Sequence, residues 1–215
     1  FAATPPLEAK KFLFSRAATR RGLGSQKLVF IDIKRAYMYA PEIREIYVEL
    51  PQQDAEEGMC GRLRKSMYGT RGAAQSWEGH YSDIFINVLG FAQGKASPCC
   101  FYHKERDLRV VVHGDDFTGL GTDEQCAWLV EMLRKHFELK VSGKLGPEAG
   151  DDKMVRILNR TVAWTDRGIE YEPDSRHAEI VVKQLKMYDK GVNSVVTPGV
   201  KDDSGHTDET PLDSQ

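Results

Sequence analysis

Apolar and polar positions in the first third of the chain predict a helix followed by a buried strand. From residue 9 to about residue 22, apolar side chains such as Phe12 and Leu13 recur at helical spacing after the helix-starting sequence Thr-Pro-Pro. Residues 27–33 are rich in β-branched and aromatic side chains and are too few for a helix. This run predicts a buried strand that ends near the carboxylate of Asp32.

The next part of the chain predicts a short strand, a loop and an amphipathic helix. Residues 46–50 have the composition of a short strand, and the polar, glycine-bearing stretch 51–61 is typical of a loop. From 73 to 90 the apolar side chains keep to one helical face until Gly90. We therefore expect a helix over this range.

Two short strands around a glycine predict a β-hairpin in the middle of the chain. Residues 109–113 and 117–120 are apolar runs, separated by Gly114-Asp115-Asp116. A capping-box sequence then opens a helix predicted over 122–136, and 137–141 alternates like a strand. The hairpin places two adjacent carboxylates at its tip.

The end of the chain predicts one more helix and a polar tail. We expect the helix over about 174–191, because apolar residues recur there at helical spacing until a glycine. Residues 200–215 are polar and acidic and lack aromatic side chains, which predicts an extended or disordered tail. Helices interleaved with short strands indicate the α+β class, with an antiparallel sheet backed by helices.

Charge, hydropathy and cysteine content bear on the partners and the cellular compartment that we expect for this chain. The net charge is −2, but residues 1–75 carry +5 and the remainder −7, so the first third could face phosphates or could carry only scattered surface charge. No run reaches the roughly 18 apolar residues of a membrane span, so we expect no span in this chain. The four cysteines do not form the pairs of a zinc site, which predicts reduced thiols in an intracellular, reducing compartment.

Three carboxylates form the strongest candidate site. Asp32 ends a predicted strand, and Asp115 and Asp116 lie at the tip of the predicted hairpin. Carboxylates on adjacent strands can hold two Mg²⁺ ions about 3.5–4 Å apart, an arrangement that supports phosphoryl transfer. Oxygen ligands suit Mg²⁺ better than thiols or imidazoles do. Taken alone, an acidic pair after glycine is also typical of an ordinary turn.

Five segments in order resemble the reverse transcriptases of copia-type retrotransposons. That family has a strand with a catalytic Asp followed by Ala and an aromatic residue, an E-I-Y strand, an L-Y-G-L-K-Q-A segment, a Y-V-D-D hairpin and a later T-P. The matching residues in this sequence are Phe30–Tyr37, Glu45–Val48, Arg62–Trp77, Val111–Asp116 and Val196–Pro198.

The resemblance implies a fold and a division of the chain. The expected fold is a reverse-transcriptase-like palm, an antiparallel sheet backed by helices, with partial fingers and the start of a thumb. Residues 1–145 would form the partial fingers and the palm, 146–199 the end of the palm and a thumb-like helical region, and 200–215 a flexible tail. The family's upstream fingers, its ribonuclease H and its integrase are not found in this sequence, so we expect part of a longer polymerase.

The resemblance also implies catalytic roles. Asp32, Asp115 and Asp116 would hold two Mg²⁺ ions, and the backbone around Ile33 would lie near the incoming triphosphate. Tyr37 would be the ring that excludes a ribose 2′-hydroxyl and so selects deoxynucleotides; the alternative is a packed core aromatic.

Two cations complete the expected site. Lys65 and Arg71 would contact phosphates of the template or the nucleotide, or else lie in a solvated loop. The implied partners are an RNA or DNA template-primer and deoxynucleoside triphosphates, and the implied function is RNA-directed DNA polymerase.

Several positions depart from the family pattern. His113 and Gly114 replace a Tyr and an apolar residue, Gly72 replaces a Gln, and 154–158 lacks the Gly of a primer-gripping turn. These departures favour a second hypothesis, in which a copia-derived palm serves as a non-catalytic docking subunit among the protein subunits of a larger assembly. An unrelated α+β domain with accidental acids is the third.

Overall fold

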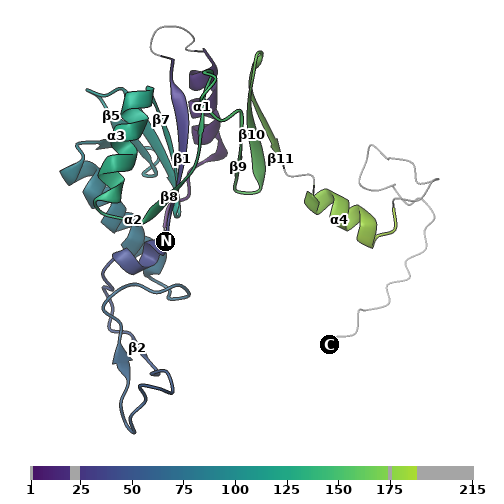
Figure 1. Cartoon of the computed structure of the whole chain (residues 1–215). Coiled ribbons are helices and arrows are strands. Elements are labelled where there is room, and N and C mark those ends of the chain that lie inside the picture. Colours follow the sequence, from purple (N-terminus) through teal and green to yellow (C-terminus); the bar gives the residue numbers. More distant parts are fainter. Residues whose placement is uncertain (1, 20–24, 174–175, 188–215) are drawn as a thin grey trace, which may run out of the picture. The chain divides into compact units, whose positions relative to one another are not determined.

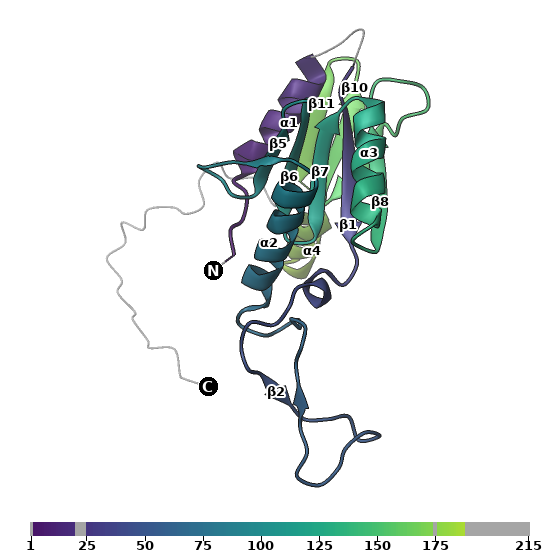
Figure 2. The same ribbon diagram turned by 90° about the vertical axis from the view of Figure 1, so that its left-hand side faces the viewer.

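An antiparallel sheet of six strands forms the centre of the larger of two structural units (Figures 1 and 2). The structure, a computed structural model, describes residues 2–19, 25–173 and 176–187, and it divides into the units Phe1–Pro173 and Asp174–Gln215. In spatial order the strands are β4 (Ala92–Gln93), β5 (Cys100–His103), β6 (Leu108–His113), β7 (Asp116–Gly121), β1 (Lys27–Ile33) and β8 (Leu139–Leu145).

Strand β1 is buried on both of its faces, which explains its continuous apolar sequence. Val29, Ile31 and Ile33 point to one face of the sheet, and Leu28 and Phe30 to the other, because side chains alternate along a strand. It pairs with β7 on one side and with β8 on the other. The predicted strand at 27–33 and the predicted hairpin of β6 and β7 are confirmed.

One face of the sheet is covered by two helices. They are α2 (Ala73–Asp83), continued by the π-helical turn η2 (Ile84–Val88), and α3 (Asp123–Arg134). Trp77 of α2 and Phe117 of β7 belong to the large cluster of buried side chains on this face. Both predicted helices are confirmed, with α3 ending two residues earlier than predicted.

The opposite face carries the first helix and a second sheet. Helix α1 (Leu7–Thr19) contacts strands of the central sheet and also β11, and the second sheet has the order β11-β10-β9 (Figure 1). The bounds of these strands are β9 (Met154–Ile157), β10 (Arg160–Thr165) and β11 (Gly168–Pro173). On α1, Leu13, Phe14 and Ala17 are buried, whereas Phe12 is 58% exposed although it belongs to the apolar pattern that predicted this helix.

The sequence analysis did not predict the three-stranded sheet. Its strands are mostly half-buried and rich in polar residues, so the two-residue period is weak. Leu158 and Asn159, between β9 and β10, both have positive φ, as a two-residue hairpin turn requires. The prediction of a strand at 137–141 holds only in part, because β8 begins at Leu139 and runs on to Leu145.

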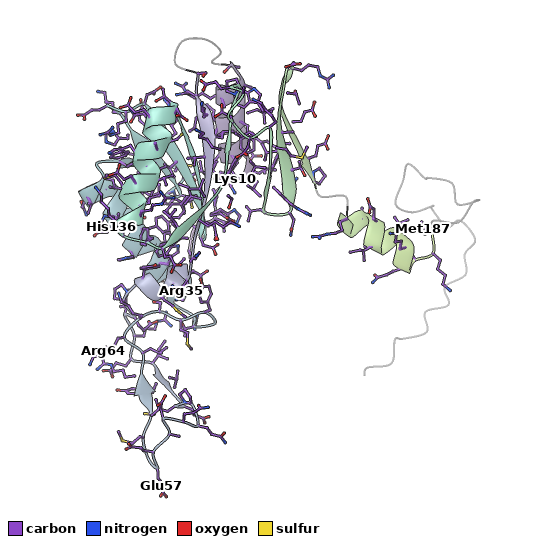
Figure 3. The ribbon with its side chains drawn as sticks, in the orientation of Figure 1. Lys10, Arg35, Glu57, Arg64, His136 and Met187 are labelled. Carbon is purple, nitrogen blue, oxygen red and sulfur yellow. The ribbon has the colours of Figure 1, made fainter. Side chains whose placement is uncertain are left out.

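Residues 41–66 form an arm that extends away from the central sheet (Figures 1 and 2). The arm follows the 3-10 turn η1 (Ala36–Tyr39) and contains β2 (Tyr47–Val48) paired with β3 (Gly61–Arg62). The strand predicted at 46–50 is therefore confirmed over two residues. Figure 3 shows Arg35 near the base of the arm and Glu57 at its far end.

The second unit contains helix α4 (Arg176–Gln184). The predicted last helix is confirmed over this range, and its expected continuation beyond residue 187 and the tail at 200–215 lie outside the described residues. Within the described ranges, no helix combines the length and apolarity needed to cross a bilayer. Taken together, the described elements are mixed α and β with antiparallel sheets, as predicted.

A buried lysine joins the start of β1 to the loop after β8. The side chain of Lys27 is 3% exposed, and its Nζ lies 2.8 Å from Glu148 Oε2 and 2.9 Å from Asp151 Oδ1. Asp123, at the start of α3, lies 3.4 Å from the same nitrogen, and Lys144 Nζ lies 3.7 Å from Asp151. We call these five residues the Lys27 network; it ties together β1, α3, β8 and the loop.

Gly119 is needed where β7 passes under α3. A Cβ atom there would lie 2.8 Å from Val29 Cγ1 and 2.9 Å from Leu129 Cδ2, inside the packed core. We expect Gly119→Ala to lower the free energy of unfolding by about 1–3 kcal/mol, measured by urea denaturation. Gly79→Ala, in α2 with no atom within 4 Å of the new Cβ, is the control and should instead stabilise by about 0.5–1 kcal/mol. A neutral Gly119→Ala would contradict the packing argument.

Candidate active site

The sheet brings together the three acids that the sequence analysis selected. Asp32, on β1, lies directly opposite Asp116 at the start of β7, and His113 of β6 pairs with Asp116 from the other side. The backbone N–H of Ile33 donates to the carbonyl oxygen of Asp115 at 2.9 Å. The tip of the hairpin is thus fastened to the end of β1.

A side chain of helix α2 holds the hairpin turn in place. Gly114 has φ +64°, a conformation that favours glycine, and it takes the first position of the two-residue loop between His113 and Asp116. The Trp77 indole Nε1 donates a hydrogen bond of 2.9 Å to the Gly114 carbonyl. Trp77 is 1% exposed, so the turn rests on a fixed side chain.

The carboxylates influence one another. Asp115 is exposed and Asp116 is half-buried. Burial raises the pKa of Asp116, the charges of Asp115 and Asp32 raise it further, and Lys10 opposes them. The three acids therefore form one electrostatic cluster, which we call the acidic cluster. In it, the charges of Asp32 and Asp115 disfavour ionisation of Asp116.

Lys10 is a charged residue of this site that the sequence analysis missed. Only 4% of it is exposed, and Figure 3 shows it in the interior of the unit. Burial lowers the pKa of Lys10, although the charge of Asp116 raises it. Lys10 is buried with Leu13, Phe14 and Ala17, so a lysine occupies an apolar position of the buried helical face. A lysine at an apolar position of the helix was the sequence feature that could have identified Lys10 as a site residue.

The chemistry of the three carboxylates fits a divalent cation. Within residues 2–19, 25–173 and 176–187, no group of three or more His, Cys, Asp or Glu side chains is already arranged to hold a metal. However, Asp32, Asp115 and Asp116 supply the oxygen ligands that Mg²⁺ takes, and their mutual repulsion is of the kind that a bound cation offsets. The donor type and the charge therefore fit Mg²⁺.

Tyr37 lies beside a second tyrosine. The rings of Tyr37 and Tyr68 are 4.5 Å apart between centroids, with an interplanar angle of 36°. Tyr37 belongs to η1, which follows Arg35 in the left-handed conformation, and Tyr68 precedes α2. Tyr68 was not selected from the sequence, although it lies within the segment 62–77 that carried the resemblance.

The other predicted site residues have different surroundings. Ile33 is 1% exposed, and its N–H is already bonded to the hairpin. Lys65 is exposed and its Nζ donates to the carbonyl oxygen of Tyr39 at 2.7 Å, whereas Arg71 is exposed just before α2. Lys65 thus lies at the base of the arm, within the same part of the chain as η1.

Gly72 lies next to the side chain of Arg44, a basic residue of the arm. A Cβ atom on Gly72 would lie 3.7 Å from Arg44 Nε, in ordinary contact. The space above this glycine is therefore bordered by a guanidinium group.

Comparison with known proteins identifies a family. A family model described as reverse transcriptase (RNA-dependent DNA polymerase) matches residues 12–151. The chain is also 25% identical, over 175 residues, to the retrovirus-related Pol polyprotein from transposon TNT 1-94 of Nicotiana tabacum. This match covers 78% of the chain and 12% of that polyprotein, so the chain spans a small part of its relative. The range matched by the family model contains all three acids, Tyr37 and Tyr68.

Proposed function

Because the chain belongs to the reverse transcriptase family of copia-type retrotransposons, we propose that it extends a DNA primer on an RNA or DNA template by two-metal nucleotidyl transfer. The observation that carries the proposal is the placement of Asp32 opposite Asp116, with Asp115 at the adjoining hairpin tip. The end of β1, the start of β7 and the turn before β7 thereby place the three acidic residues at one end of these neighbouring strands. The proposed partners are a template-primer and deoxynucleoside triphosphates.

Under this proposal the central sheet and its two covering helices are the palm. Residues 1–145 include the palm and partial fingers, to which the arm belongs, and 146–199 end the palm and begin the thumb. The burial of β1 on both faces supports this assignment, since it gives the acids a rigid base.

The proposed chemistry forms a bond between the primer 3′-oxygen and the α-phosphorus of the nucleotide and breaks the bond from that phosphorus to the bridging oxygen. Pyrophosphate leaves, and the proton of the 3′-hydroxyl passes to solvent. Asp32, Asp115 and Asp116 hold the cations and thereby fix the reacting groups in place. When bound, Mg²⁺ lowers the pKa of the attacking hydroxyl and stabilises the leaving oxygens. Enzymes of this family use divalent metal ions.

The remaining residues would bind the nucleotide. The ring of Tyr37 excludes a ribose 2′-hydroxyl, and the backbone that follows Ile33 lies near the triphosphate. Lys65 and Arg71 contact phosphates as exposed cations, and such contacts fix position without reading sequence.

Primer extension tests the proposal directly. We expect the full-length protein to extend a labelled primer on an RNA template in the presence of Mg²⁺. The Asp115→Asn/Asp116→Asn double variant should lose at least about 10³-fold in rate, because it removes two anionic ligands. A folded protein that extends no primer would contradict the proposal and favour the non-catalytic docking role.

A further inference from the structure

The tilted pair of rings formed by Tyr37 and Tyr68 lies at the edge of the acidic cluster rather than in the core. Tyr68 remains 46% exposed, and Tyr37 is half-buried against the large core cluster. The Tyr68 ring is therefore accessible to a molecule bound beside the acids, and its one aromatic neighbour among the described residues is Tyr37.

The ring of Tyr68 contacts the ring of Tyr37, with 4.5 Å between their centroids. Burial and the charge of Asp115 raise the pKa of Tyr68, and the nearby backbone of Tyr37 and Ala36 opposes them only in part. Tyr68 is therefore close enough to Asp115 to sense its charge, and it lies against the turn that follows Asp32.

Tyr37, by contrast, has free space beside it. A cavity of about 340 Å³ is lined by Tyr37 together with His113 and Gly114 of the hairpin. A ring that borders such a cavity can change its rotamer unless another group restrains it. Tyr68 is a ring in contact with Tyr37 that can provide this restraint.

We propose that Tyr68 is a positioning residue for nucleotide selection: it holds the Tyr37 ring in the orientation that excludes a 2′-hydroxyl. The proposal rests on the proposed function, since it assumes that Tyr37 meets the sugar of the incoming nucleotide. A restrained ring rejects a ribonucleotide by steric contact. If Tyr37 moved toward the cavity, the additional hydroxyl would be accommodated.

The test compares nucleotide binding and nucleotide incorporation. Binding of dATP and of ATP, each with Mg²⁺, is measured by titration calorimetry without primer, and KM and kcat by single-nucleotide extension. The variants are Tyr68→Ala, Tyr68→Phe and, as control, Tyr102→Ala, a similarly exposed tyrosine on β5. All variants are first checked for an unchanged thermal transition.

We expect Tyr68→Ala to reduce the preference for dATP over ATP by about tenfold, close to the upper range for one aromatic pair. The kcat for dATP should stay within about threefold, because the carboxylates are untouched. Tyr68→Phe keeps the ring that contacts Tyr37 and should restore selectivity to within about twofold of the wild type. Tyr102→Ala should match the wild type.

The outcomes separate this proposal from the polymerase proposal. Tyr68→Ala with wild-type selectivity would overturn the role of Tyr68 and leave the polymerase proposal intact. A protein that binds dATP selectively through Tyr68 but extends no primer would support the role of Tyr68 and sink the polymerase. Absence of nucleotide binding by the wild type would overturn the role of Tyr68.

Discussion

Replacing Asp116 with asparagine is expected to raise the melting temperature of the protein while it reduces primer extension by at least about 10³-fold. The activity is lost because a metal ligand is lost, and ligands of this kind stabilise several kcal/mol of developing charge. The stability increases because asparagine resembles a protonated carboxyl group, which burial and the charges of Asp115 and Asp32 favour at this position.

The sign follows from the raised pKa of Asp116. A carboxyl group whose pKa is higher in the folded state binds more protons when folded, so stability falls as the pH rises from the ordinary carboxyl range through that higher pKa. Ionised Asp116 therefore destabilises the folded state relative to the protonated form, and asparagine removes this cost. We expect a gain of about 2 °C, a modest figure because solvent screens a half-buried charge.

Thermal scans at several pH values check this result. The gain of Asp116→Asn should shrink as the pH is lowered toward 4, where the wild-type carboxyl group protonates as well. Asp54→Asn, an exposed acid of the arm, is the control and should change neither the melting temperature nor primer extension. An asparagine variant that melts below the wild type at pH 7 would show that the cluster is not under repulsion.

The Lys27→Met variant is expected to lose about 3–5 kcal/mol of unfolding free energy. This substitution leaves Asp151 buried, with a side chain only 2% exposed, and without its closest cation. Lys144 lies 3.7 Å from the same carboxylate and is 38% exposed, so it replaces the lost charge only in part. Urea denaturation measures the loss.

Lys144→Met is the matched control for Lys27→Met. It removes a cation from the same network at a partly exposed position, and we expect a loss below about 1 kcal/mol. A loss of similar size in both variants would contradict the argument that burial sets the energy. The double variant Lys27→Met/Asp151→Asn should lose less than the two single variants together, because neither charge is then left unpaired.

The Lys27 network also limits the pH range of stability. Hydrogen bonds to Lys144 and Lys27 lower the pKa of Asp123. The ionised carboxylate therefore stabilises the folded state, and this stabilisation is lost as the pH falls below the ordinary carboxyl range. Burial lowers the pKa of Lys27, but its bonds to Glu148 and Asp151 prevail and raise it, so its contribution is lost at strongly alkaline pH. Both contributions are present from about pH 5 to pH 10.

Sequence patterns predicted those elements whose burial is complete or clearly one-sided. β1, the β6–β7 hairpin, α2 and α3 all carry dense apolar sequences, and their positions follow from those sequences. The sheet of β9, β10 and β11 carries no such signal, since most of its side chains are half-exposed. The arm was predicted only in part, because two-residue strands have no measurable period.

In the candidate site, too, residues in local sequence features could be predicted, whereas residues brought in by tertiary packing could not. The acids could be selected because a strand end and a hairpin turn are local features, whereas Lys10 approaches them only through the packing of α1 on the sheet. Gly114 was a departure from the family pattern in the sequence, yet its positive φ is what the turn requires. Tyr68 and Tyr37 come together only when the base of the arm folds back.

The order of strands in the central sheet also determines when the site can form. β1 lies early in the chain, but its two partners, β7 and β8, follow some 85 to 115 residues later. A ribosome-bound chain thus carries Asp32 on an unpaired strand until the hairpin has been synthesised. The long segment between β1 and its partner strands must be closed into a loop before any contact between them can stabilise the sheet. This entropic cost slows folding. The acidic cluster is accordingly a late product of folding, and its assembly reports that β1 has paired with the β6–β7 hairpin.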